Sequence, residues 1–312
     1  MRKNKESAMR NEKLTKRLLF WALLCAVLNA APVFGQIKID IKGALEWDKQ
    51  EINAVVSLDM ASSGLKLPNG RMQGEALIAS EYIGLIRPAI LSLQVDSSST
   101  VADLVKRGEW SSLDVENLAL QVRTVPPALS PDLANLLAFY TLNINDISGA
   151  LMRHERPSEV PVTLTPVSAP AYTGIIIIAA ENLPVYGTRS AALLRPCLFP
   201  KIWDMEMKLI FERNMLKPRS GAMVHYFSMR EIFAGGPSGL SREIAAVVGN
   251  RPLRIFARGV FGMQPTDPII NKEDALQIIS NKENRNLLSE GRVAIIIDDT
   301  LLVNPLSGSV TE

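Results

Sequence analysis

The chain has 312 residues, of which 47% are hydrophobic and 21% charged, the usage of an ordinary globular protein. Its two cysteines exclude a disulfide scaffold or a zinc site built from cysteines, and its two histidines leave little room for a histidine-rich metal centre. Seven of the 34 basic residues and two of the 32 acidic residues lie in residues 1–35, so the remainder carries a net charge of −3. Because nucleic-acid binding needs a concentrated basic face, no nucleic-acid partner is expected.

The N-terminus has the pattern of an export signal. Residues 1–17 are polar and basic, and residues 18–31 are apolar except for Asn29. This apolar run is shorter than the roughly 20 residues of a membrane-spanning helix, and small residues follow it. The pattern predicts a signal peptide over 1–35, cut between Gly35 and Gln36, with Ala30 or Ala31 as the alternative last residue. Such a protein is expected in the periplasm or cell envelope.

Two alternatives would leave the chain attached to a membrane. The first is an uncleaved signal that acts as an anchor. The second is a lipid on Cys25, which the sequence disfavours because Cys25 follows two leucines and lies inside the apolar run. After cleavage at Gly35, Cys197 is the one remaining cysteine, so no disulfide can form within the chain.

A proline-rich segment, 156–171, divides the exported part. It has four prolines and no glycine, which predicts an extended, semi-rigid linker. The fold class predicted for the chain is α+β, with two small α/β-type domains on either side of this linker. The predicted parts are a signal peptide (1–35), an N-terminal α+β domain (36–155), the linker (156–171), a C-terminal α/β domain (172–306) and a tail (307–312).

Hydrophobic periodicity predicts the elements of the first domain. Alternation indicates strands, and a period near four residues indicates a helix that Pro88 would kink or end at Arg87. A further helix is expected to start at Ser130, and the later half of the segment that follows it alternates like a strand. The predicted strands are 37–41, 52–60 and 117–125, and the predicted helices are 71–93 and a short one ending at Lys106.

Strands and helices alternate in the second domain, which is typical of a layered α/β fold. The apolar run 174–180, bounded by turn residues, has the pattern of a buried strand. A helix over 238–248 should begin at Ser238 or Ser241, and a single helix is expected from Asn271 to Glu290. The other predicted strands are 223–227, 253–260 and 292–298.

No catalytic constellation is apparent, and no cofactor is expected. Asp298 and Asp299 follow a predicted buried strand, where a metal could sit, but a turn between two hairpin strands is the favoured explanation for them. His225 alternates with apolar residues and is expected to be a hydrogen-bonded sheet residue. These three residues are the weak candidates for a site. Cys197 is expected to be a small buried hydrophobic residue.

Short motifs resemble those of a bacterial flagellar-assembly and membrane-lipoprotein family, the FlgP/FlgT-like envelope proteins. In the second domain they are Thr173-Gly174 with the isoleucine run after it, the segment from Pro196 to Asp204, and Arg251-Pro252-Leu253. Thr266-Asp267 and Asp274-Ala275 follow. In the first domain they are the Trp47 strand, Gly70-Arg71 before a helix, and Val95-Asp96-Ser97. Ile178 stands where the family has an aspartate.

The resemblance implies a structural or assembly component of the envelope that works through protein–protein contacts and is accessory to the flagellar motor. Its partners would be envelope or flagellar proteins, or other copies of itself. Two alternatives stay open: a periplasmic module that binds a ligand or the cell wall, and an envelope enzyme that uses Asp298, Asp299 and His225.

Overall fold

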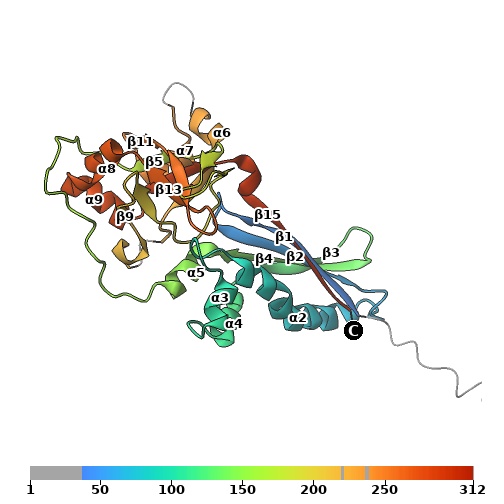
Figure 1. The fold of residues 1–312 in the computed structure, drawn as a ribbon. Coiled ribbons are helices and arrows are strands. Elements are labelled where there is room, and N and C mark those ends of the chain that lie inside the picture. The colour runs from blue at the N-terminus through green and yellow to red at the C-terminus, as the bar shows by residue number, and fades with distance from the viewer. Residues whose placement is uncertain (1–36, 219–220, 236–238, 312) are drawn as a thin grey trace, which may run out of the picture.

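The computed structural model describes residues 37–218, 221–235 and 239–311 (Figure 1). The chain is an α+β protein of two domains, and the proline-rich linker leads from the first to the second. The predicted signal peptide, Cys25 and the cleavage position at Gly35 and Gln36 lie outside the described residues. Within the described ranges, no helix combines the length and the apolar character needed to cross a bilayer.

The first domain is built on a five-stranded antiparallel sheet of order β15-β1-β2-β4-β3. Alternate residues of the three central strands are buried, because the sheet packs one face against helices and leaves the other face open. The strands are β1 (Lys38–Glu46), β2 (Glu51–Asp59), β3 (Arg123–Leu129), β4 (Asn135–Asn143) and β15 (Val303–Thr311).

Helix α2 (Gly70–Ser92) lies along the inner face of this sheet, and Ile78, Tyr82, Ile86 and Ile90 are buried there. The predicted helix over 71–93 is thus confirmed. Of the two alternatives predicted at Pro88, a kink or an end at Arg87, the end is wrong, since the helix continues through Pro88 to Ser92. Three shorter helices complete the domain: α3 (Val101–Lys106), α4 (Ser112–Leu120) and α5 (Ile144–Leu151).

Two further predictions for this domain differ from the structure. Of the strand expected over 117–125, residues 117–120 belong to helix α4, which Ser111 begins with a capping box to Asp114, and only Arg123–Val125 are strand, at the start of β3. Ser130 begins no helix, because its hydroxyl and Asp132 instead close a turn into strand β4. At Ser111 and at Ser130 a serine side chain forms a local hydrogen bond with the backbone. Such a bond can begin a helix or close a turn, and the sequence does not show which of the two it does.

The chain end also differs from the prediction. The tail expected over 307–312 contributes most of its residues to β15, which returns to the first domain and pairs with β1 over nine residues. Its sequence, VNPLSGSVT, has Gly, Pro and Ser at positions where strands usually carry β-branched residues. Pairing with β1, and not local propensity, therefore makes it a strand.

A four-stranded parallel sheet of order β10-β14-β5-β11 forms the centre of the second domain. Isoleucines fill its two middle strands, so both faces are buried, and the strands expected over 174–180 and 292–298 are confirmed. The strands are β5 (Ile175–Ile178), β10 (His225–Ser228), β11 (Leu253–Phe256) and β14 (Val293–Ile297).

Short helices accompany this sheet. The helix predicted over 238–248 is α7 (Arg242–Val248), capped by Ser241. The single helix expected from Asn271 to Glu290 is two helices, because Asn281 caps a new start by accepting a hydrogen bond from the backbone N–H of Glu283. These two are α8 (Lys272–Ile279) and α9 (Lys282–Ser289), and α6 (Met229–Phe233) follows β10.

Other strands lie beside the main sheet of this domain. A second four-stranded sheet, of order β12-β13-β8-β9, and a two-stranded ribbon complete it. The second sheet contains β8 (Ile202–Asp204), β9 (Leu209–Phe211), β12 (Gly259–Phe261) and β13 (Asp267–Ile270), and the ribbon contains β6 (Leu183–Pro184) and β7 (Ala191–Ala192). Short 3₁₀ turns lie at Arg213–Met215 and Asp299–Leu301.

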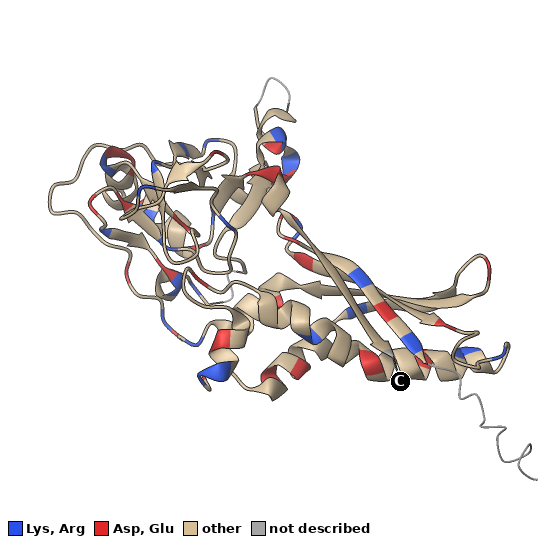
Figure 2. Ribbon diagram, turned by 45° about the vertical axis from the view of Figure 1, so that its right-hand side comes forward, with Lys and Arg blue, Asp and Glu red and all other residues tan. Residues whose placement is uncertain are grey.

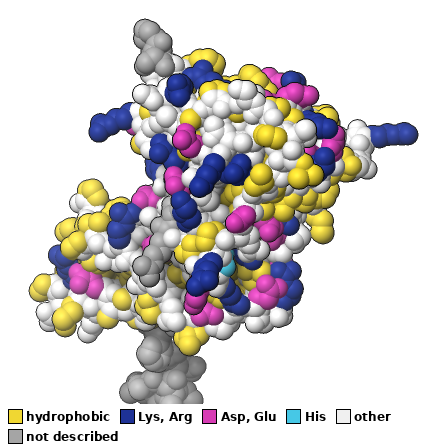
Figure 3. All heavy atoms as spheres, turned by 90° about the vertical axis from the view of Figure 1, so that its left-hand side faces the viewer, with side chains coloured by type: hydrophobic (Ala, Val, Ile, Leu, Met, Phe, Trp, Pro, Cys, Tyr) yellow, Lys and Arg dark blue, Asp and Glu magenta, His cyan; other side chains and the backbone are white. Residues whose placement is uncertain are grey.

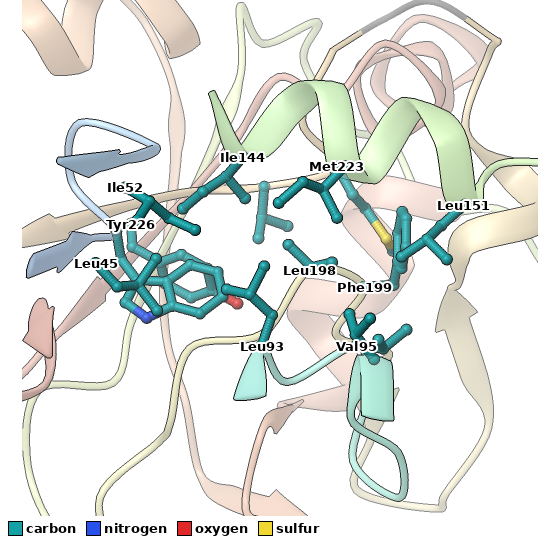
Figure 4. Packing of buried hydrophobic residues seen from close by; sticks show 14 of the residues in the cluster. Leu45, Ile52, Leu93, Val95, Ile144, Leu151, Leu198, Phe199, Met223 and Tyr226 are labelled. Atoms are coloured by element: carbon teal, nitrogen blue, oxygen red, sulfur yellow. The ribbon is translucent and has the colours of Figure 1, made fainter. Parts of the chain in front are cut away.

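The two domains share one hydrophobic core. Leu45, Ile52 and Leu93 of the first domain pack with Leu198 and Tyr226 of the second (Figure 4). Backbone hydrogen bonds also cross the junction, from the N–H of Leu198 to the carbonyl of Gln94 (3.0 Å) and from the N–H of Phe199 to that of Val95 (2.8 Å). Direct packing therefore fixes the two domains relative to each other.

The linker has no helix and no strand, and it runs over the second domain. The amide of Asn284 donates to the carbonyl of Pro170, and that of Asn281 donates to the carbonyl of Ala169. Leu164, near the middle of the linker, is fully exposed. At its other end the N–H of Ser158 donates to the carbonyl of Asn214 (2.7 Å), so the linker is held at both ends and is not what sets the spacing of the domains.

Candidate functional site

The structure gives Asp298 and Asp299 local structural roles. Asp298 follows β14 and accepts hydrogen bonds from the backbone and hydroxyl of Thr300, which begin the 3₁₀ turn. These bonds lower the pKa of Asp298. Asp299 pairs with Arg230, at 3.0 Å between Oδ2 and Nε. The strand that follows is β15 of the other domain, so the aspartates do not join two strands of a hairpin.

His225 does not join the two aspartates. It begins β10 and is paired with Ala294, four residues before Asp298 along the neighbouring strand β14. At about 3.3 Å per residue, the two ends of this strand segment are about 13 Å apart. Burial lowers the pKa of His225, so its imidazole is favoured in the neutral form. The three weak candidates therefore form no common site.

Charged side chains are spread over the molecule. On the face of Figure 3, basic and acidic side chains are interspersed, not gathered by sign. Among the described residues, no group of three or more His, Cys, Asp or Glu side chains is placed to hold a metal ion. A specific contact with a partner is therefore expected to depend on surface shape and on unpaired backbone groups. Backbone groups of this kind lie at the edges of the five-stranded sheet.

The two edges of the five-stranded sheet differ in how they are protected against pairing. At one edge, β3 carries Arg123, two consecutive prolines at 126 and 127, and a register shift between Val125 and Ala128. Charges, prolines and bulges are the features by which proteins protect an edge strand from pairing with another chain. The β3 edge is thus blocked.

The other edge, β15, is long, regular and uncharged. Its nine residues pair with β1 without a register shift and span about 30 Å. It contains no Lys, Arg, Asp or Glu, as Figure 2 shows beside the alternating charges of β1, and Pro305 is its one proline. Ser307, Gly308 and Ser309 are exposed. One side of β15 therefore offers backbone N–H and C=O groups without a strand partner among the described residues.

A groove lies between β15 and helix α2. Its volume is about 380 Å³, and it is lined on the helix side by Gly84, Leu85, Pro88, Ala89 and Ser92. On the strand side every residue from Pro305 to Val310 lines it. Since alternate side chains of a strand point to opposite faces, the residues whose side chains point away must line it with their main chain. We call this space, with the extension described next, the β15 groove.

The groove continues toward the second domain and becomes polar. A second hollow, of about 180 Å³, shares Ser92, Pro305 and Leu306 with the first. At its far end lie the side chains of Gln94, Arg195, Gln264 and Asn304. Arg195 is exposed and donates to the amide oxygen of Gln264 at 3.2 Å. The β15 groove thus has an uncharged middle and one cationic end, beside the start of β15.

Trp47 lies in the wall of this polar end. Its side chain is 4% exposed, and its indole Nε1–H has no acceptor among the described residues. A buried donor without an acceptor costs free energy, and proteins rarely leave one unexplained. An acceptor supplied by a bound molecule would remove this cost.

Sequence reasoning missed the β15 groove. The missing signal was the strand itself, because residues 307–312 were expected to be a tail. The absence of charge in 303–311, together with an exposed glycine, Gly84, inside helix α2, is the pattern that could have indicated it. Cys197, in contrast, is buried as expected, at 1% exposure.

Comparison with protein families matches both domains. Residues 38–150 match a model described as the N-terminal domain of Treponema pallidum Tp0624, and residues 174–299 match one described as its second domain. No curated protein matches the chain at a significant level. The resemblance to flagellar-assembly proteins is not tested by these matches and stays a prediction. The chain is therefore similar, over both of its domains and in the same order, to the N-terminal and second domains of Treponema pallidum Tp0624.

Proposed function

We propose that the protein is an exported component of the cell envelope that acts by binding other proteins, in a structural or assembly role. The observation that carries this proposal is the contrast between the two edges of its first sheet. One edge is blocked by Arg123, two prolines and a bulge, whereas β15 is regular, uncharged and bordered by a groove. An unprotected edge strand is a template for pairing with another chain.

The hydrophobic core shared by the two domains supports the same proposal. Because Leu198 and Tyr226 pack against residues of the first domain, the second domain is held where Arg195 and Gln264 can close one end of the β15 groove. A rigid, preformed groove loses little conformational entropy on binding. Export is inferred from the basic and apolar segments of residues 1–35.

Two variants of helix α2 test this function in cells. A Cβ at Gly84 would meet no atom within 4 Å, so Gly84→Leu adds bulk beside β15 without a clash. Leucine also favours a helix over glycine, by up to about 1 kcal/mol per residue, so the fold should not be weakened. Ala79→Leu is the matched control, since Ala79 is exposed on the same helix and does not line the groove.

The expected result is that Gly84→Leu fails to complement a deletion strain, whereas Ala79→Leu complements it. Both proteins should be present in the envelope fraction at wild-type levels. Full complementation by a stable Gly84→Leu protein would contradict a role for the β15 groove. Retention of the wild-type chain in the cytoplasm would contradict export.

A further inference from the structure

We infer that the β15 groove binds the extended C-terminal segment of a partner protein, which adds antiparallel to β15 and places its terminal carboxylate at Arg195. This inference rests on the proposed function and names the chemistry of the partner.

The main chain of β15 sets the first part of the recognition. An extended peptide beside β15 would exchange backbone hydrogen bonds with the free side of the strand, as in other cases of strand addition. Nine residues of β15 are regular, so a matching segment of six to nine residues fits without a bulge. Pro305 cannot donate a bond, which leaves Leu306 to Val310 as the main pairing stretch.

Charge sets the direction of the bound segment. Arg195 lies with Asn304 at the end of the groove where β15 begins. A peptide antiparallel to β15 ends at this point, so its C-terminal carboxylate falls beside the guanidinium. A parallel peptide would place its ammonium group there, where like charges repel. Among the described residues no carboxylate pairs with Arg195, whose side chain bonds the neutral amide of Gln264.

The orphaned indole is the second observation that points to a ligand. Trp47 lines this end of the groove as well as a small inner hollow, and its buried Nε1–H lacks an acceptor among the described residues. A carboxylate or a peptide carbonyl arriving there brings acceptor oxygens. The guanidinium of Arg195 favours a negatively charged group, and the indole N–H of Trp47 needs a hydrogen-bond acceptor of any charge. A carboxylate meets both requirements.

The groove walls select the side chains of the segment. Between Gly84 and Ser92 on the helix and Pro305 and Val310 on the strand, no lining residue is charged. Leu85 and Leu306 give apolar surface, and Gly84 and Ala89 leave room. Small or medium apolar side chains at alternate positions of the peptide fit this space, since alternate positions share one face of a strand.

The test uses the purified chain and a library of nine-residue peptides with randomised uncharged residues, made once with a free C-terminus and once amidated. We expect enrichment from the free library and none from the amidated one. For an enriched peptide, amidation or Arg195→Ala should weaken binding by at least about tenfold, as expected for loss of a charge-assisted hydrogen bond. Arg195→Lys should retain most of the affinity.

Gly84→Leu should also weaken binding of the peptide by at least about tenfold. Ala79→Leu should leave the affinity for the peptide within about twofold of the wild type, which is typical of a surface substitution outside the binding site. Amide hydrogen exchange of Leu306–Val310 should slow when the peptide binds, which a peptide bound elsewhere would not cause. Equal enrichment from both libraries, or no enrichment, would overturn the inference. So would a stable dimer whose formation a peptide of sequence VNPLSGSVT blocks, because a second copy would then occupy β15.

The two proposals can fail separately. If Gly84→Leu abolishes complementation but no C-terminal peptide binds, the association function stands and the C-terminal segment is the wrong partner. If peptides bind as described but Gly84→Leu complements fully, the groove binds such segments and the association function through this groove fails.

Discussion

Lys38 and Thr311, close to the two ends of the described chain, are paired residues of neighbouring strands β1 and β15. The sheet of the first domain is therefore incomplete until residues 303–311 have returned to it across the whole second domain. This long-range pairing joins the two domains a second time, in addition to the linker. It also places the unprotected edge of the sheet on a strand that follows the second domain in the sequence.

Removal of β15, by ending the chain after Leu302, should destabilise the first domain. Ile39 and Ile41 of β1 are almost fully buried, and they lie opposite Val310 and Gly308 of β15 in the sheet. Exposing two such side chains in part costs about 3 kcal/mol, at roughly 1.5 to 3 kcal/mol for each one fully exposed. Chemical denaturation followed by circular dichroism should show this loss, and Ser307→Thr, at an exposed position, should unfold like the wild type.

The pair Asp298→Asn and Asp299→Asn should leave cellular function intact. The first removes part of a turn cap, and the second removes an ion pair to the exposed Arg230. Changes of this kind at a surface turn cost at most about 1 kcal/mol. If the double variant melts like the wild type but fails in complementation, the aspartates form a functional site after all.

Stability near acid pH should depend on Asp267. Its side chain is fully buried in β13, and burial raises its pKa although the N–H of Lys201 and the hydroxyl of Thr266 donate to it. The folded protein therefore holds a proton that the unfolded chain releases at lower pH. Its contribution to stability is present below the unfolded pKa, near 3.8, and is lost as pH rises through the higher folded value.

Asp267→Asn removes this titration. The unfolding free energy of the wild type, relative to that of Asp267→Asn, should rise as pH falls from 7 toward 4. Denaturant titrations at several pH values measure this difference. A difference that stays constant over this range would show that the carboxyl has its ordinary pKa in the folded protein.

Cys197 should resist thiol reagents in the native protein. It is 1% exposed, and burial raises the pKa of its thiol, so little reactive thiolate is present. Labelling should become fast only when the chain unfolds. The denatured protein from cells should then label at one thiol, and a second labelled thiol would show that Cys25 has not been removed with a signal peptide.

The sequence predicted the elements whose own residues determine their structure, and it did not predict those that depend on distant pairing. The isoleucine runs of β5 and β14 can only be buried, and the helix period of α2 extends over 23 residues, so these elements were predicted. The strand β15 was not, because VNPLSGSVT becomes a strand through pairing with β1, some 260 residues earlier in the chain. The groove depends on that pairing, and so it could not be predicted either.

For the candidate aspartates, the sequence predicted the position in the fold correctly but not the contacts that they make. Asp298 and Asp299 stand where strands of α/β domains often carry functional residues, and the sequence correctly marks the end of β14 there. What the sequence does not show is that Asp298 accepts hydrogen bonds from Thr300 and that Asp299 pairs with Arg230. Arg230 lies 69 residues away, and only the parallel pairing of β10 with β14 brings it close.

The measurement that tests the central claim most directly is crosslinking in living cells from within β15. A photoreactive residue in place of Ser307 should form crosslinks to at least one envelope protein, because this exposed position lies on the edge strand and lines the groove. The same residue at Ala79 should give none, and Gly84→Leu should abolish the crosslinks from position 307. If position 307 forms no crosslinks in a folded, exported protein, or if Gly84→Leu leaves them unchanged, the protein does not act through the β15 groove.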